Sequence, residues 1–342
     1  MTINVNAMKI NLYDYDAVTK DIIAVCVKNP HPTYRGTKIN LNSVRMSQAA
    51  DILENLQSGL CDTYVVSDRG IMSFIMQVKK IDYLSNYFNI DMFSIQNIVT
   101  STIDHRLNLF YANAVLPLLF ETIRELNTNG LYSLSLPAEN IALNEVFMDF
   151  GFSYREGFVS MVSKTEGFVE KLKNISPNLH GFYVDSCVEN DIADIESWYK
   201  SSTFPSRFVT EPGISTKKAT LLYAHRFREV LNNPKIGEVI CIRNENKEPV
   251  GAIIYAINQR LSSEHNIMTN LLSGMGMIIH PDYRKIGLGS TLVTHRQALY
   301  EKNGAEWVSL GANINNRKMI RCLEELGFLY GCVDISLARW YS

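Results

Sequence analysis

Several features that would assign this chain to a well-marked protein class are missing. The sequence has six cysteines, but they form no C-x-x-C pair and show no metal-ligand spacing with histidine. We therefore expect reduced cysteines in a core and no metal. Basic residues (33) do not outnumber acidic ones (35), and the net charge of −2 favours neither a nucleic acid nor an anionic membrane as partner.

Long apolar runs are also scarce. The longest, residues 109–120, is interrupted by Asn113 and Pro117 and is too short to span a bilayer. The first residues lack the charged region and apolar region of a signal peptide. We therefore expect a soluble, cytoplasmic protein.

What the sequence does contain is enough apolar material for two domains. It has 342 residues, of which 46% are hydrophobic. Two segments repeat: residues 129–136 match 303–310, and residues 140–152 match 316–328, each ending in Gly-Phe. The predicted class is α/β (α+β, mixed sheet), with a central mixed β-sheet flanked by helices in each domain. The expected boundaries are 1–165, a linker at 166–180, and 181–342.

The most specific motif is Arg284-x-x-Gly287-x-Gly289. It follows a strand-like run at 271–279 and opens a helical pattern. The first turn of a helix has N–H groups without partners and a partial positive charge, so it attracts anions. Glycines allow a phosphate to approach those amides, and Arg284 adds charge. The spacing matches neither a dinucleotide-binding fingerprint nor a P-loop.

The pattern Ile279-x-Pro281-x-x-Arg284-x-x-Gly287-x-Gly289 resembles the acyl-CoA pyrophosphate loop of the GNAT N-acetyltransferase superfamily. The segment from Asn316 to Gly327-Phe328 is similar to the family's second signature. The resemblance implies tandem GNAT-like domains and an acyl-CoA cofactor, most simply acetyl-CoA. It also implies acyl transfer to a primary amine of a small molecule or peptide. The implied cofactor-binding residues are Ile279, Arg284, Lys285, Ile286, Gly287, Leu288, Gly289, Ser290 and Asn316.

The same resemblance implies where the chemistry takes place. The pantetheine would run between strands ending at Ile279 and Leu310, and the backbone amide of Met277 or Ile278 would hold the oxyanion. Glu264 and His265 are candidates for the general base. The alternative is that they form the solvated tip of a hairpin. The tyrosine that often protonates the leaving thiolate is replaced by Leu323. We interpret Cys322, Tyr330 and His280 as structural.

The N-terminal copy of the repeat lacks the motif. When the two copies are aligned, residues 110–115 fall opposite 284–289 and contain neither the arginine nor the glycines. We expect this domain to have lost cofactor binding and to serve as scaffold, dimer surface or substrate wall. Binding of CoA by another route and a homodimer are left open. The loop at 201–213 lies where the family's acceptor pocket is lined, or is a plain surface loop.

Two other functions compete with catalysis of amine acylation. A non-catalytic acyl-CoA-binding or sensor protein fits the missing acid and base. A tandem transferase that uses aminoacyl-tRNA, as peptidoglycan-bridge enzymes do, fits less well, because the phosphate loop is intact and a basic surplus is absent.

Overall fold

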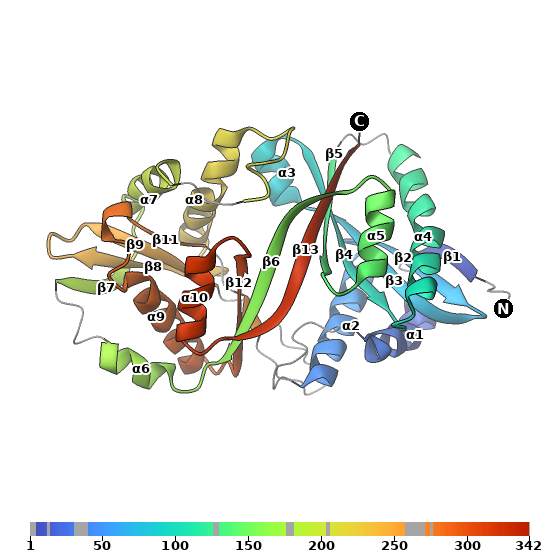
Figure 1. The fold of residues 1–342 in the computed structure, drawn as a ribbon, viewed down its shortest axis with the longest axis horizontal. Helices are drawn as coiled ribbons and strands as arrows, with labels where there is room; N and C mark the ends of the chain where they lie inside the picture. Colours follow the sequence, from blue (N-terminus) through green and yellow to red (C-terminus); the bar gives the residue numbers. More distant parts are fainter. Residues whose placement is uncertain are drawn as a thin grey trace. The chain divides into compact units, whose positions relative to one another are not determined.

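The computed structural model describes residues 5–11, 14–30, 40–125, 130–175, 181–202, 206–256, 271–273 and 276–341. The chain forms two compact units (Figure 1). The N-terminal unit comprises Met1–Phe158 and Cys332–Ser342, and the C-terminal unit comprises Val159–Gly331. None of the described helices is both long and apolar enough to cross a membrane.

The N-terminal unit has a sheet in the order β1-β2-β3-β4-β5-β13. Its elements are β1 (Val5–Ile10), α1 (Tyr15–Lys28), α2 (Leu41–Gln57), β2 (Asp62–Asp68), β3 (Ile71–Lys80), α3 (Asp82–Phe88), β4 (Asp91–Thr100), α4 (His105–Glu125), β5 (Gly130–Pro137) and α5 (Ile141–Asp149). Two strands, β6 (Ser153–Lys164) and β13 (Leu329–Tyr341), pass from one unit to the other.

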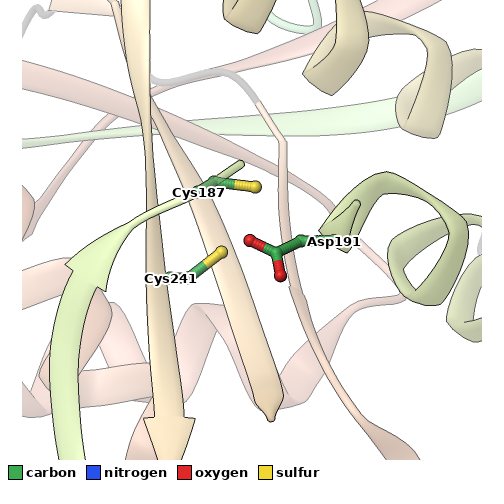
Figure 2. Close-up of side chains that lie close together, drawn as sticks. All are labelled: Cys187, Asp191 and Cys241. Carbon is green, nitrogen blue, oxygen red and sulfur yellow. The ribbon is translucent and has the colours of Figure 1, made fainter. Parts of the chain in front are cut away.

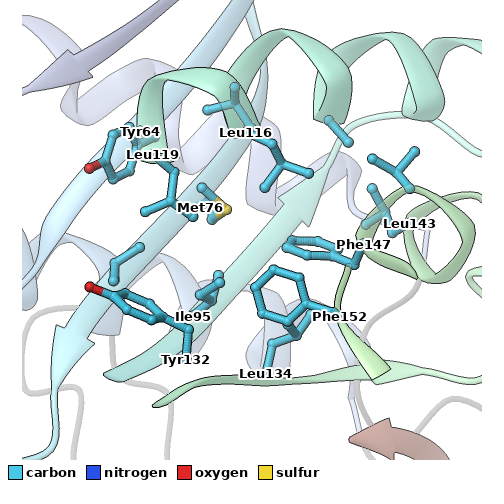
Figure 3. Packing of buried hydrophobic residues seen from close by; sticks show 14 of the residues in the cluster. Tyr64, Met76, Ile95, Leu116, Leu119, Tyr132, Leu134, Leu143, Phe147 and Phe152 are labelled. Atoms are coloured by element: carbon cyan, nitrogen blue, oxygen red, sulfur yellow. The ribbon is translucent and has the colours of Figure 1, made fainter. Parts of the chain in front are cut away.

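Both faces of this sheet carry apolar side chains, and helices pack against each face. On one face α4 and α5 contribute Leu116, Leu119 and Phe147 to a core with Met76 and Ile95 from the strands (Figure 3). On the other face α1 and α2 pack on a second buried cluster. β2 and β3 form a hairpin, with successive positive φ values at positions 69 and 70, as a tight two-residue turn requires.

The C-terminal unit has strands in the orders β11-β9-β8-β7 and β6-β12-β10. Its elements are α6 (Phe168–Ile175), β7 (Phe182–Ser186), α7 (Asp191–Lys200), α8 (Thr216–Asn232), β8 (Gly237–Asn244), β9 (Pro249–Ala256), β10 (Leu271–Ser273), β11 (Met277–Ile279), the 3₁₀ turn η3 (Pro281–Tyr283), α9 (Leu288–Lys302), β12 (Trp307–Asn313) and α10 (Arg317–Glu325).

The compact units differ from the predicted domains at two places. The expected linker contains helix α6, whose Phe168 is buried in the core of the C-terminal unit. At the other end, Asp334–Tyr341 of β13 pairs antiparallel with β5 and places Leu337 in the core of the N-terminal unit. The boundaries of the units therefore depend on which strands pair with each other, including strands far apart in the sequence, and not on the order of the residues along the chain.

The internal repeat is confirmed in three dimensions. Asn140 and Asn316 each cap a helix, accepting the N–H of Leu143 at 3.4 Å and of Met319 at 3.3 Å. Both helices end at a glycine with positive φ, 81° at Gly151 and 91° at Gly327. The two units thus share a strand, helix and turn built from the same local signals.

Candidate functional site

The loop between η3 and α9 has the backbone conformation of an anion cradle. Lys285 and Gly287 have φ values of 70° and 94°. The first helical bond of α9 runs from the N–H of Thr291 to the carbonyl of Gly287 at 3.1 Å. Within the described chain, no hydrogen bond takes up the N–H groups of residues 285–290. Adjacent unpartnered amides at a helix N-terminus form a site for a phosphate group.

The two glycines of the loop keep the space in front of these amides open. A Cβ at Gly287 would have no neighbour within 4 Å, while the positive φ there disfavours any other residue. A Cβ at Gly289 would lie 3.7 Å from Cε of Met277 and 4.0 Å from Cγ1 of Ile279, which is ordinary contact. Packing inside the protein therefore does not require a glycine at 289, whereas close approach of a ligand does.

Arg284 fastens the loop to two neighbouring segments. Its side chain is exposed; Nε donates to the carbonyl of Ile279 at 3.0 Å, and Nη2 donates to Oγ of Ser202 at 2.6 Å. Ser202 follows α7, at the start of the loop expected to line an acceptor pocket, and residues 203–205 of that loop lie outside the described residues. Sequence reasoning missed Ser202, because nothing in the spacing of the chain connects positions 202 and 284.

The remaining cofactor candidates surround the start of α9. Ile286 is exposed, whereas Leu288 is buried and anchors the helix in the core of the C-terminal unit. Ser290 Oγ lies 3.4 Å from Cys322 Sγ of α10. The side chain of Asn316 caps α10, as described above. Ser290 and α10 are thereby held beside the phosphate loop.

Strand pairing distinguishes between the two amides expected to hold an oxyanion. Ile254 donates its N–H to the carbonyl of Gly276 at 3.0 Å, and His280 donates its N–H to the carbonyl of Val250 at 2.9 Å. In an antiparallel ladder such pairs recur at every second residue. Ile278, opposite Ala252, therefore directs its amide toward β9, which favours Met277 of the two expected oxyanion donors. The amide of Met277 points to the opposite edge.

That edge is where the strand changes its partner. β10 pairs in parallel with β12 from Leu271 opposite Trp307 to Ser273 opposite Ser309. Among the described residues, β11 then pairs only with β9. The described residues of the expected strand at 271–279 form β10 and β11, and the last described parallel pair is Ser273 with Ser309. The arrangement agrees with a cofactor arm that enters between two separating strands.

The candidate acids and bases are placed less favourably. Leu323 is fully buried and has no proton to donate. Tyr330 donates its hydroxyl to the Glu324 carboxylate at 2.6 Å, and this hydrogen bond raises the pKa of Tyr330. Burial raises the pKa of the Cys322 thiol. Glu264 and His265 lie outside the described residues.

The His280 ring makes contacts that suit the structural role expected for it. Its Nδ1 accepts the N–H of Asp282 at 3.2 Å, so the ring caps η3. Edge-on contacts with Trp198 at 5.6 Å and Tyr283 at 5.5 Å between ring centroids hold it in place.

One group of potential metal ligands occurs among the described residues, formed by Cys187, Asp191 and Cys241 (Figure 2). The Asp191 carboxylate is already engaged: Arg243 donates to both of its oxygens, at 3.1 and 2.8 Å, and the N–H of Val188 donates to one at 2.8 Å. The hydrogen bond to Cys241 and burial raise the pKa of the Cys187 thiol. These contacts join the start of α7 to β8 through an ion pair.

The corresponding junction in the N-terminal unit is different. α4 begins directly after Asp104, whose carboxylate accepts the N–H groups of Arg106 at 2.8 Å and Leu107 at 3.1 Å. Residues 110–115, which the alignment set against the phosphate loop, lie inside α4, so that alignment is wrong. Residues 101–104 connect β4 to α4, and residues 280–287 connect β11 to α9. Because the first connection is shorter, an alignment that counts back from the later repeat places the phosphate-loop equivalent too far along the chain.

Comparisons with known proteins agree with this geometry. Residues 192–328 match the family described as Acetyltransferase (GNAT) family. A GCN5-related N-acetyltransferase from Sphaerobacter thermophilus has a similar structure, with a TM-score of 0.58, 12% identity, and coverage of 98% of this chain and 95% of the other. A tandem GNAT protein from the clavulanic acid biosynthesis pathway has a TM-score of 0.56 and 10% identity over 98% of both chains.

At these identities the structural likeness shows the fold alone. No curated protein sequence matches the chain. The sequence match lies within the C-terminal unit, and the structural matches extend over both units. The chain has the tandem GNAT fold, and its C-terminal unit is a domain of the GNAT acetyltransferase family.

Proposed function

We propose that the C-terminal unit transfers an acyl group from acyl-CoA, most simply acetyl-CoA, to a primary amine of a small molecule or peptide. The observation that carries the proposal is the open set of backbone amides at 285–290. It follows β11 through the 3₁₀ turn η3, and the amide of Met277 in β11 has no partner among the described residues. One element would thus bind a diphosphate, and the adjacent strand would present an oxyanion donor. The bound cofactor supplies an activated thioester.

Each part of the site has a separate task in this proposal. The amides of residues 285–290 and the Arg284 guanidinium bind the diphosphate. The Met277 N–H stabilises the negative charge that develops on the carbonyl oxygen during attack by the amine. Positioning of the two reactants in one site supplies a large part of such a rate enhancement. The amine attacks directly, so a covalent enzyme intermediate is not required.

A non-catalytic acyl-CoA-binding protein is the second candidate. It is favoured by Leu323, which is fully buried where relatives carry a proton donor, and by Tyr330, which is engaged with Glu324. CoA thiolate is a stable leaving group that water can protonate, so catalysis without a dedicated acid remains chemically complete. The two candidates differ in turnover and not in binding.

The test combines calorimetric titration with acetyl-CoA and an assay of thiol release across a panel of primary amines. We expect one site per chain, loss of that site in Gly289→Asp, and thiol release with at least one amine. Binding without release from any amine would favour the non-catalytic candidate. If acetyl-CoA does not bind, or binds equally to Gly289→Asp, the proposed site is wrong.

A further inference from the structure

Helix α9 contains a buried arginine that no carboxylate neutralises within the described chain. Arg296 is only 1% exposed. Its Nη1 is 3.5 Å from the carbonyl of Ile254, and its Nε has no hydrogen-bond partner. Burial lowers the pKa of Arg296 to about 10, so the guanidinium is still charged at neutral pH. A buried charge is normally paired, because its desolvation is costly.

Three further side chains on the same helix are buried and lack partners for polar atoms. Among the described residues these are Thr294 (Oγ1), Gln297 (both amide atoms) and Tyr300 (Oη), the last of which lies near the backbone of Ala256. Most buried polar atoms in proteins are hydrogen-bonded, and groups without partners often mark a place for a ligand or water. Of the three, only Tyr300 lies on the same side of α9 as Arg296, because residues four apart are turned by about 40°, whereas Gln297 and Thr294 are turned by about 100° and 200°. The unpartnered Nε of the buried Arg296 guanidinium therefore marks the place where we look for a polar ligand.

The position of Arg296 relates it to the proposed thioester site. Gly289, Arg296 and Tyr300 fall on one stripe of α9, because residues seven and eleven apart return to nearly the same direction. Gly289 lies under Met277 and Ile279 of β11. Arg296 is about 10 Å further along the helix axis, which corresponds to about three residues of a strand.

The hydrogen bonds agree with this placement. The Ile254 carbonyl that Arg296 approaches belongs to the residue that donates its N–H to Gly276, and Gly276 precedes Met277. In the proposed function, the diphosphate lies at the start of α9 and the thioester lies at Met277. The part of an acyl group beyond its carbonyl then continues away from the phosphate loop, toward Gly276 and Arg296.

We propose that Arg296 binds a carboxylate at the far end of the acyl group, so that the preferred donor is a dicarboxylic acyl-CoA such as succinyl-CoA. This inference rests on the proposed function and names the donor class for the same site. The guanidinium donates to both carboxylate oxygens, and Tyr300, one helical turn further on the same stripe of α9, offers a hydroxyl as a further donor. A neutral acyl group of the same length leaves these donors unsatisfied.

The test compares succinyl-CoA with butyryl-CoA, which has the same chain length and a methyl group in place of the carboxylate. Titration of the full chain should give succinyl-CoA an affinity at least about tenfold higher, as expected for a charged hydrogen-bonded pair. In Arg296→Met this preference should disappear, while binding of acetyl-CoA is retained. Arg296→Lys should keep part of the preference, and Lys302→Met, which removes an exposed charge from the same helix, should keep all of it.

Thermal unfolding separates ligand binding from a structural role. Methionine replaces an unpaired buried cation, so Arg296→Met should unfold at the same or a higher temperature than the wild type without ligand. A large drop in that temperature, with the preference for succinyl-CoA intact, would overturn the proposal. Equal affinities of the wild type for the two ligands, with normal acetyl-CoA binding, would also overturn it and leave the proposed function standing. Failure of all three thioesters to bind would refute both.

Discussion

The two units begin a helix after a central strand in contrasting ways. In the N-terminal unit, the amides of the first turn of α4 are taken by the carboxylate of Asp104, and Oγ1 of Thr102 accepts the N–H of Asp104 at 3.0 Å. In the C-terminal unit, Lys285 and Gly287 bend the chain with positive φ values, and none of the described residues accepts from the equivalent amides. The junction before α4 thus contains a carboxylate of the protein itself, Asp104, at the helix N-terminus. The junction before α9 leaves the corresponding position open for an external anion.

The framework around the two junctions is otherwise alike. β4 pairs in parallel with β5 only as far as Ile95 opposite Leu134, and β10 pairs in parallel with β12 only as far as Ser273 opposite Ser309. In both units the last parallel pair among the described residues precedes the helix junction. We therefore expect the local cap, and not the separation of the strands, to decide which unit binds acyl-CoA.

The largest effect is expected from a carboxylate placed in the open junction. Gly287→Asp should weaken acetyl-CoA binding about a hundredfold or more, because a negative charge then lies beside the diphosphate. Gly304→Asp is the matched control, since Gly304 also has positive φ and open space around its Cβ but lies at the other end of α9. Calorimetric titration of both variants measures the difference. Equal loss in both would mean that strain, and not the cradle, explains the result.

A smaller effect is expected from the arginine of the open junction. Arg284→Gln should weaken acetyl-CoA binding about tenfold, as for loss of a charge-assisted hydrogen bond. The affinity of the variant should also depend less on salt, because one charge pair is removed. Arg321→Gln, which removes an exposed arginine from α10, should bind as the wild type does. Titrations at two salt concentrations measure both quantities, and an unchanged affinity of Arg284→Gln would remove this residue from the site.

The filled junction should respond in stability and not in binding. Asp104→Ala should lower the free energy of unfolding of the N-terminal unit by about 1 kcal/mol, because two N–H groups lose their cap. Asp104→Asn, which retains a capping oxygen, should be close to the wild type. The stoichiometry of acetyl-CoA should stay at one per chain. A second site in the alanine variant would show that the carboxylate alone had been blocking it.

The smallest effect is expected at Tyr330. Its hydrogen bond to Glu324 raises its pKa, so the phenol stays protonated to a higher pH than usual. Because the exposed hydroxyl is directed to that carboxylate, Tyr330→Phe should change kcat less than about twofold, which is within the range of a neutral surface substitution. The pH profile of kcat should also be unchanged. A large loss of kcat, with the alkaline limb of the profile displaced, would identify Tyr330 as the acid.

Local signals in the sequence were sufficient for the parts of the site that depend on neighbouring residues. The loop that leads into α9 at 284–289, the caps at Asn140 and Asn316 and the glycines that end both helices follow from short-range rules, and the structure contains each of these local conformations. The amphipathic helix α6 was missed because the surrounding Gly, Pro and charged residues indicated a linker. The apolar side of that helix is clear only with Phe168 in a core.

Features that depend on distant residues could not be predicted. The apolar alternation of β13 suits a sheet in either unit, and only its register with β5 assigns it to the N-terminal unit. The choice between Met277 and Ile278 required the register of β11 with β9. Arg296 looks like an ordinary exposed residue of a helix, and only the structure shows that it is buried.

Hydrogen exchange with and without acetyl-CoA tests the contrast between the two junctions most directly. Amides that bind the diphosphate exchange more slowly, so we predict protection of residues 285–290 and no change at residues 104–107. The same protection should be absent in Gly287→Asp and present in Gly304→Asp. Protection at 104–107, or saturating acetyl-CoA without protection at 285–290, would contradict the account.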